Sequence, residues 1–365
     1  MRFKTFEQKW EYSTIGECSI SLEYGMNATA IKYDGKHKYI RITDIDEETS
    51  AFIPNPLSSP DGELEEKYLV KENDILFART GASVGKSYLY NNNDGELYFA
   101  GFLIRARIKS EYNGTFIYYQ TKSKKYDRWV KLTSMRSGQP GINSQEYSSY
   151  PIALTSKDEQ DKIADFLQLL DNRISVQNKI ISKYETLIKG LCDRVFRHNK
   201  SIRLSDLVKC RTATLQESDI VKYCDGEYKV FGASGVIATI DKYQFDRSGI
   251  LVLKDGSNAG KVQFASGKYS VIGTSVVLIP NDVNDAKFLY FALLAVDFDK
   301  YKVGSGIPHI YFKDYSNEQI YYPEATLREK INKTLSCYET KVEIEKEMLS
   351  ALQKQKTFLL QSMFI

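Results

Sequence analysis

The chain has 365 residues, of which 42% are hydrophobic and 27% charged, and its formal net charge is +3. This length suits about two globular domains, and the nearly neutral balance means that any affinity for nucleic acid must come from local clusters of Lys and Arg. The five cysteines form no Cys-x-x-Cys pair, which argues against a disulfide framework or a zinc site. No apolar run approaches about 20 residues and no signal peptide is recognisable, so we expect a cytoplasmic protein with no membrane contact.

The first 150 residues carry short apolar runs, such as Tyr39 to Ile42, broken by Gly, Asn and Asp, and this pattern predicts a β-rich domain. A helix is expected from Thr115 to Arg128. Basic residues gather in and after this helix, with aromatic residues between them, and they predict a face that binds DNA phosphates. The alternative is the solvated flank of an ordinary helix. The basic residues are Lys122, Lys124, Lys125, Arg128, Lys131 and Arg136.

A heptad pattern runs from Lys157 to His198, where apolar residues alternate spacings of four and three and Gln177 interrupts them. The segment has no Pro and a single Gly, so one long helix is expected. The residues expected at the pairing seam are Ile163, Leu167, Leu170, Ile174, Ile181, Ile188 and Leu191.

The second half of the chain follows the same plan. Residues 200–323 again alternate apolar runs with turns, and a helix is expected from Asp285 to Tyr301. A second heptad segment follows Pro323, with Glu345 at the position that matches the first polar break. Two amphipathic helices that each pack on their own domain are an alternative, but the matching registers favour antiparallel pairing. The second set of seam residues is Ile331, Leu335, Val342, Leu349 and Leu352.

Short motifs also recur in the same order. The run Ser-Gly-Gln-Pro-Gly-Ile at 137–142 returns as Ser-Gly-Ile-Pro-His-Ile at 305–310, and Tyr147 matches Tyr315 at the same offset. Upstream, the glycine-rich run 81–86 returns at 256–261. Several such matches in one order indicate an internal duplication.

Signals of catalysis are weak. The run from Gly81 to Ser87 is one residue short of a phosphate-binding loop, and the second copy has Val262 where a magnesium-binding hydroxyl would be needed. A hairpin turn that presents Lys86 and Lys261 to the DNA backbone is the favoured interpretation. With three histidines and no recognisable nucleotide or methyltransferase motif, we expect no metal site and a binding role.

Two β-rich arms, each closing on a Ser-Gly-x-Pro-x-Ile turn and followed by a heptad helix, resemble the specificity subunits of type I restriction–modification systems. The runs 74–81 and 228–235 are similar to that family's target-recognition domains. The resemblance implies an α+β fold with two β-rich domains in a pseudo-twofold arrangement, separated by two long antiparallel coiled-coil helices. The expected boundaries are 1–155 for the first recognition domain, 156–199 for the first helix, 200–324 for the second domain and 325–365 for the second helix.

The resemblance also implies a function. Each arm would read one half of a bipartite double-stranded DNA target, and the helices would set the spacing and dock two methyltransferase subunits. Restriction/translocase subunits would join the full complex. The chain would carry no cofactor; S-adenosylmethionine would bind to the methyltransferase, and ATP and magnesium to the restriction subunit.

Candidate DNA-contacting residues lie beside the repeated motifs. Arg or Gln could read bases, whereas the lysines are better suited to phosphate. The second copy departs from the first at His309, which replaces Gly141. A DNA-binding scaffold without methyltransferase partners is the alternative function, and an unrecognised enzyme is a more distant one. The candidates are Arg79, Lys86, Arg136 and Gln139 in the first arm and Lys254, Lys261 and Ser305 in the second.

Overall fold

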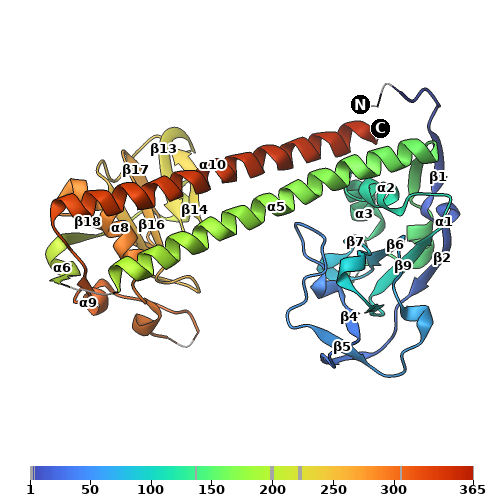
Figure 1. Ribbon diagram of the computed structural model, residues 1–365, viewed down its shortest axis with the longest axis horizontal. Helices are drawn as coiled ribbons and strands as arrows, with labels where there is room; N and C mark the ends of the chain where they lie inside the picture. Colours follow the sequence, from blue (N-terminus) through green and yellow to red (C-terminus); the bar gives the residue numbers. More distant parts are fainter. Residues whose placement is uncertain are drawn as a thin grey trace. The chain divides into compact units, whose positions relative to one another are not determined.

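The computed structural model describes residues 3, 5–135, 138–197, 201–220, 224–304 and 306–364. The chain divides into two compact units: unit 1 comprises residues 1–176 and 349–365, and unit 2 comprises residues 177–348. Both heptad segments form continuous helices, α5 (Lys157–Phe196) and α10 (Ala325–Met363), and each unit contains part of both (Figure 1). The domain boundaries at 155, 199 and 324 stay predictions.

Unit 1 is built on a four-stranded antiparallel sheet with the order β2-β9-β6-β7. Strand β6 is buried along its whole length. Its alternate side chains enter different cores, with Ile75 and Phe77 in one and Leu76 and Ala78 in another, so both faces of the sheet are covered. The bounds are β2 (Ser19–Tyr24), β6 (Asp74–Ala78), β7 (Ser87–Leu89) and β9 (Leu103–Ile108).

Three further strand pairs complete the β structure described in unit 1. The antiparallel pairs are β1 (Glu11–Thr14) with β10 (Pro151–Leu154) and β3 (Thr29–Lys32) with β5 (Ser58–Asp61). The parallel pair is β4 (Lys38–Ile40) with β8 (Leu97–Phe99). Short helical turns connect these strands: α1 (Ile15–Cys18), η1 (Ile42–Asp44), η2 (Glu66–Tyr68), η3 (Gly81–Ser83), η4 (Asn92–Asp94) and α4 (Ser144–Ser148).

Two helices, α2 (Gly114–Gln120) and α3 (Lys124–Thr133), occur where one was expected from 115 to 128. The break arises because Ser123 has extended backbone angles and its side chain caps α3 by accepting a hydrogen bond from Tyr126 N–H at 3.3 Å. Phe116 of α2 packs in the same core as Leu167 of α5 and Leu359 of α10. The β-rich part of unit 1 is therefore joined to both long helices by one hydrophobic core.

Unit 2 repeats this plan. Its four-stranded sheet has the order β12-β18-β15-β16, which matches β2-β9-β6-β7 strand for strand, and β13 pairs in parallel with β17 as β4 does with β8. The predicted duplication is therefore confirmed by topology. The strands are β11 (Ile202–Arg203), β12 (Val208–Thr212), β13 (Cys224–Gly232), β14 (Gly235–Ile240), β15 (Gly249–Leu253), β16 (Val262–Ala265), β17 (Tyr269–Val271), β18 (Ser275–Pro280) and β19 (Gln319–Ile320).

The main helix of unit 2 besides α5 and α10 is α8 (Ala286–Leu294), which ends before Tyr301, where the expected helix was to end. Residues Phe288, Leu289 and Phe291 of α8 are buried, and Phe288 contacts Phe196 of α5 edge to face at 5.3 Å between ring centroids. The shorter segments are α6 (Leu204–Leu207), α7 (Glu217–Ile220), η5 (Val283–Asp285), η6 (Asp299–Tyr301) and α9 (Phe312–Tyr315).

The helices α5 and α10 pack against each other in an antiparallel sense within each unit. In unit 2, Gln177 bonds to Glu345 and the rings of Tyr184 and Tyr338 lie 6.5 Å apart, so numbers rise along one helix as they fall along the other. In unit 1, Lys356 Nζ of α10 lies 2.5 Å from Asp171 Oδ1 of α5. Of the predicted seam, Ile163, Leu167, Leu170, Ile181, Ile188, Leu335, Val342 and Leu352 are buried, and Ile174, Leu191, Ile331 and Leu349 are half-buried.

The two polar breaks of the heptad pattern meet. Gln177 Nε2 donates a hydrogen bond to the backbone oxygen of Glu345 at 3.0 Å and a second one to its carboxylate. A polar pair inside an apolar seam favours one register, because any shift leaves both groups without partners.

Among the described residues, no helix is long and apolar enough to cross a membrane.

Candidate nucleic-acid interface

The repeated motifs of unit 1 are brought together by backbone hydrogen bonds. Gly81 N–H donates to Pro140 O at 3.0 Å, and Ile142 N–H donates to Arg79 O at 2.9 Å. We call residues 79–86 with 138–142 the clip of unit 1. The glycine-rich run lies between β6 and β7, as its interpretation as a hairpin turn predicts.

Unit 2 contains the same clip, formed by residues 254–261 and 306–310. Gly256 N–H donates to Pro308 O at 3.0 Å, and Ile310 N–H donates to Lys254 O at 2.9 Å. These two bonds are equivalent to the two in unit 1. The clip backbone is therefore the same in both arms, whereas its side chains differ.

Glycine is required at one equivalent position of both clips. Gly85 has φ 88° and Gly260 has φ 92°, in the left-handed region that favours glycine. A Cβ on Gly85 would lie 2.6 Å from Val130 Cγ1, and one on Gly260 would lie 2.5 Å from Phe298 Cβ. These glycines serve close packing of the turn rather than a nucleotide.

Arg79 is the most distinctive cation of the unit 1 clip. Its guanidinium carbon lies 4.9 Å from the ring centroid of Tyr24, and its buried Nε has no hydrogen-bond partner within the described ranges. No ion pair to Arg79 occurs among those residues either. The Nε is out of reach of solvent, so an external acceptor would meet the terminal nitrogens of this half-buried guanidinium.

The ring of Tyr24 packs against the Arg79 guanidinium, and a hydrogen bond fixes the position of Tyr24. Its hydroxyl oxygen accepts a hydrogen bond from Ser144 N–H at 3.1 Å. Burial raises the pKa of Tyr24, but the bonds from Ser144 and the positive charge of Arg79 outweigh it, so the pKa lies below its ordinary value. Sequence reasoning did not select Tyr24, because nothing local to it indicates a contact with a residue 55 positions away.

The other basic candidates of unit 1 fall into two groups. Lys86 pairs with Glu47 at 2.8 Å, and Lys122 donates to Ser50 Oγ at 2.8 Å and to Ser87 O at 2.9 Å. Burial, followed by the positive charge of Lys356, lowers the pKa of Lys122 to about 7. Both lysines make contacts within the chain, Lys86 with an exposed carboxylate, and their contacts with DNA stay predictions.

The exposed group lies on α3. Lys124, Lys125 and Arg128 are exposed, while Tyr126 and Val130 on the opposite face are buried in the core. Within the part of the chain that the structure describes, these three cations have no carboxylate partner. The exposed side of α3 therefore carries these three cations beside the exposed carboxylate of Asp127, and its role in phosphate binding stays a prediction.

The remaining candidates are placed as follows. Gln139 and Lys261 are exposed. Lys254 Nζ lies 3.9 Å from Asp255 Oδ2, and Asp255 in turn contacts His309. His309 was noted from the sequence only because it replaces Gly141. Arg136 and Ser305 lie outside the described residues. The contacts of these residues with DNA stay predictions.

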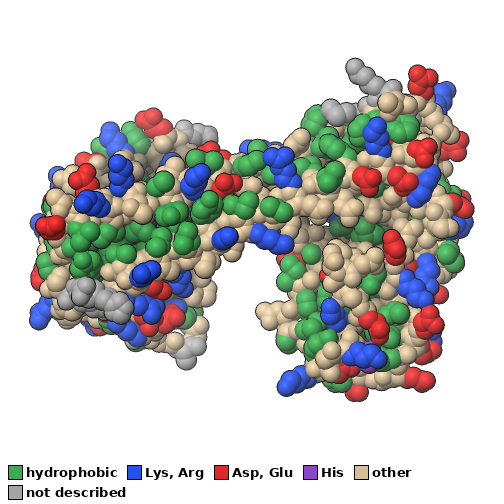
Figure 2. Space-filling model, viewed as in Figure 1, with side chains coloured by type: hydrophobic (Ala, Val, Ile, Leu, Met, Phe, Trp, Pro, Cys, Tyr) green, Lys and Arg blue, Asp and Glu red, His purple; other side chains and the backbone are tan. Residues whose placement is uncertain are grey.

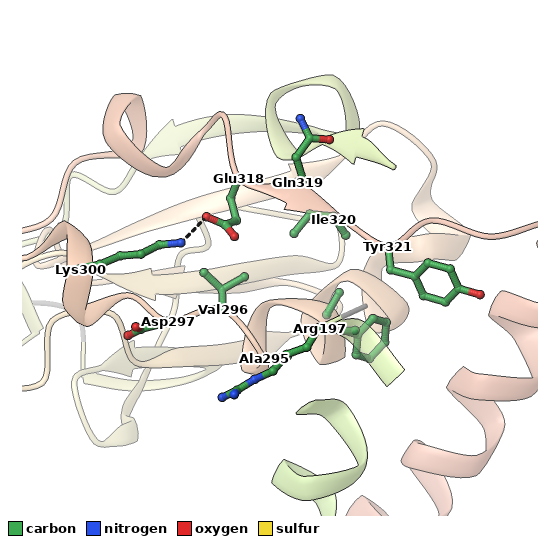
Figure 3. Close-up of a pocket in the computed structure, with 11 residues that line it drawn as sticks. Arg197, Ala295, Val296, Asp297, Lys300, Glu318, Gln319, Ile320 and Tyr321 are labelled. Carbon is green, nitrogen blue, oxygen red and sulfur yellow. Dashed lines mark hydrogen bonds and ion pairs between the residues drawn. The ribbon is translucent and has the colours of Figure 1, made fainter. Parts of the chain in front are cut away.

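A pocket of about 410 Å³ occurs elsewhere in unit 2, between the end of α5, the end of α8 and β19 (Figure 3). Lys300 and Glu318 form an ion pair at 2.7 Å on one side of it, and Tyr301 also donates to the Glu318 carboxylate. This carboxylate is occupied by contacts within the chain. None of the DNA candidates that the structure describes lines the pocket. In the described ranges, no group of three or more His, Cys, Asp and Glu is placed to hold a metal ion.

Comparison with known proteins finds similarity to proteins of type I restriction systems. The family described as "Type I restriction modification DNA specificity domain" matches residues 7–186 and 197–354. A curated relative, the type I restriction enzyme MjaVIII specificity subunit of Methanocaldococcus jannaschii, is 26% identical over 176 residues, which are 45% of this chain and 41% of the relative. The match thus spans less than half of that relative's length.

Two solved structures share the fold. The type I restriction–modification S subunit from M. genitalium matches with a TM-score of 0.66 and 18% identity, over 98% of this chain and 96% of that one. A chain from a study of complex assembly and conformational transition of the type I R-M system matches with a TM-score of 0.55 and 15% identity, over 96% of each chain.

Proposed function

The chain belongs to the family of type I restriction–modification DNA specificity subunits, and we propose that it is the DNA-reading, non-catalytic subunit of such a complex. Residues 1–155 and 200–324 would each read one half of a bipartite double-stranded target. The helices of 156–199 and 325–365 would set the distance between the halves. Other subunits would carry the methylation and cleavage chemistry.

The observation that carries this proposal is the clip, which occurs twice with one backbone and two sets of side chains. Arg79, Thr80 and Gly141 in unit 1 correspond to Lys254, Asp255 and His309 in unit 2. Sequence is read by polar groups at base edges, while the scaffold only positions them. A duplicated scaffold with different polar groups is what an asymmetric, two-part target requires.

Positive charge supports the same proposal. Because the net charge is only +3, binding to a polyanion depends on local faces such as the exposed Lys124, Lys125 and Arg128 of α3. Lysines and arginines at such a face contribute affinity that is independent of sequence. Arg79 at the clip adds a planar donor that suits either a phosphate or a guanine edge.

The long helices are the proposed docking surface for methyltransferase subunits. Large apolar side chains that do not enter the seam remain exposed on them, and Figure 2 shows hydrophobic side chains gathered along this surface. Contiguous exposed apolar surface commonly marks a protein interface. The exposed residues are Phe166, Leu169, Val176 and Phe358 in unit 1 and Leu187, Leu327, Ile344 and Met348 in unit 2.

The rest of the complex is inferred from the family. We propose two methyltransferase subunits that bind S-adenosylmethionine, and restriction/translocase subunits that use ATP and magnesium, with no cofactor on this chain. The complex would act in the cytoplasm, where it would methylate host DNA and restrict phage DNA. A DNA-binding scaffold without methyltransferase partners is the alternative, and co-purification with a methyltransferase separates the two.

The test is to co-produce the chain with the methyltransferase of its own system and to map methylated positions on genomic DNA. Residues 1–150 are then exchanged for the corresponding arm of another specificity subunit, and the mapping is repeated. We expect a split motif in which only one half changes. Absence of methylation, or a single unsplit motif, would refute the proposal. A control variant, Arg128→Ala, should weaken binding to all duplexes alike and leave the motif unchanged.

A further inference from the structure

The clip of unit 2 carries a side-chain pair that the clip of unit 1 lacks. His309 Nδ1 lies 2.8 Å from Asp255 Oδ1, at the positions occupied by Gly141 and Thr80 in unit 1. A carboxylate only accepts hydrogen bonds, so Nδ1 of the imidazole is the donor. In the neutral ring this leaves Nε2 as an acceptor.

The pair is not needed to close the clip. Unit 1 makes the same two backbone bonds, Gly81 N–H to Pro140 O and Ile142 N–H to Arg79 O, without any such pair. A Cβ on Gly141 would meet only Arg79 O at 3.4 Å, which is an ordinary contact, so this position accepts a side chain. The Asp255–His309 pair is therefore not required to close the clip, and it adds hydrogen-bonding groups that the clip of unit 1 lacks.

Both members of the pair can be reached from solvent. The side chains of Asp255 and His309 are 35% and 39% exposed. Lys254 Nζ stands 3.9 Å from Asp255 Oδ2, which is beyond hydrogen-bond distance, so Oδ2 keeps its capacity to accept. The clip of unit 2 thus presents acceptors beside a cation.

A carboxylate on a DNA-facing turn carries an electrostatic cost, because phosphates repel it. That cost is offset where the carboxylate accepts a hydrogen bond from a base, and in the major groove the base donors are the amino groups of adenine N6 and cytosine N4. An isolated acidic residue near phosphate weakens binding to every sequence equally. A carboxylate joined to an imidazole acceptor suits base edges that present an amino group.

We propose that Asp255 and His309 are a specificity-determining pair of the second arm, which accepts a hydrogen bond from an exocyclic amino group in the major groove. The inference rests on the proposed function, in which residues 200–324 read one half of the target. Thr80 of unit 1, which can both donate and accept, would serve a different base edge. The pair therefore helps to make the two half-sites unequal.

The first experiment repeats the methylation mapping with Asp255→Asn and His309→Gly. Asparagine preserves shape while adding a donor, and glycine restores the residue that unit 1 has at this position. We expect the base preference at a position of the second half-site to relax or change, with the first half-site and the spacing retained. The matched control is Thr80→Ala, which should leave the second half-site unchanged.

The second experiment measures binding of the methyltransferase complex to duplexes that lack single amino groups. Each adenine of the second half-site is replaced in turn by purine, and each cytosine by pyrimidin-2-one. At one position we expect the wild type to lose about 5- to 150-fold in affinity, the range of one good base contact. The Asp255→Asn and His309→Gly complexes should lose little at that position, and its identity distinguishes adenine from cytosine.

The outcomes separate the two proposals. Absence of a split motif in the wild type defeats the proposed function itself. A split motif whose second half is the same in the wild type and both variants overturns the assignment of the pair alone. If a variant abolishes methylation, the duplex series decides: retained sensitivity to every amino group contradicts the pair, and loss of sensitivity at one position supports it.

Discussion

Tyr147 and Tyr315 occupy equivalent positions in the two units, yet their hydroxyl groups differ in partners. The Tyr147 hydroxyl donates to Ala78 O at 2.7 Å and accepts from Gly85 N–H at 3.2 Å, so it connects α4 to the clip of unit 1. The Tyr315 hydroxyl is buried and has no hydrogen-bond partner in the described part of the chain. Removing the oxygen should therefore lower the free energy of unfolding at Tyr147 but not at Tyr315.

The magnitudes follow from the hydrogen bonds. Tyr147→Phe removes two, each with a net contribution of about 0.5–1.5 kcal/mol. Gly85 N–H still donates to Ala78 O at 3.0 Å, so no backbone group is left without a partner, and the expected loss is about 1–2 kcal/mol. Tyr315→Phe removes a desolvated hydroxyl without breaking a bond, so the free energy of unfolding should stay equal or rise by about 1 kcal/mol.

The measurement is urea denaturation of the full chain, followed by circular dichroism and by tyrosine and tryptophan fluorescence. Tyr311→Phe, at an exposed tyrosine of unit 2, serves as the control and should change stability by less than about 0.5 kcal/mol. If Tyr315→Phe destabilises the chain as much as Tyr147→Phe does, the reasoning from hydroxyl partners is refuted.

Two further predictions concern the helices and pH. Gln177→Leu alone should destabilise the chain by about 1–3 kcal/mol, because it removes two hydrogen bonds and leaves the half-buried Glu345 carboxylate without this donor. In urea titrations, Gln177→Leu with Glu345→Leu should restore or exceed wild-type stability. A double variant less stable than the single one would contradict this. Burial and the charge of Lys356 lower the pKa of Lys122 to about 7 in the folded chain. Between that pH and about pH 10, the unfolded chain keeps the Lys122 proton and the folded chain has lost it, so the free energy of unfolding should rise with pH. Thermal unfolding of Lys122→Met should show a smaller rise, and an equal rise would refute the assignment.

Much of the organisation was predictable because it depends on local patterns. The heptad spacing from Lys157 onward predicted α5, which ends at Phe196, and the recurrence of short motifs predicted two arms of one topology. Helix ends were less predictable. The segment after Thr115 forms two helices because Ser123 caps the second, and a single serine within an apolar pattern is a weak signal.

The candidate site was predicted only in part. The run of basic residues before Arg136 indicated a positive face, but a run cannot show that Lys122 donates to Ser50 and Ser87 while Lys124 is exposed. These contacts join residues far apart in the chain. They depend on how α2, α3 and β7 pack, which the spacing of charges does not encode.

The sequence by itself determined the duplication, the two long helices and the family, because periodicity and motif order are properties of the chain alone. Only the tertiary structure decided that Gln177 meets Glu345, that Arg79 lies on Tyr24 and that Asp255 bonds to His309. The physical reason is that each of these contacts requires the backbone to return across more than 50 residues, and side-chain partners are then selected by packing and by satisfaction of polar groups.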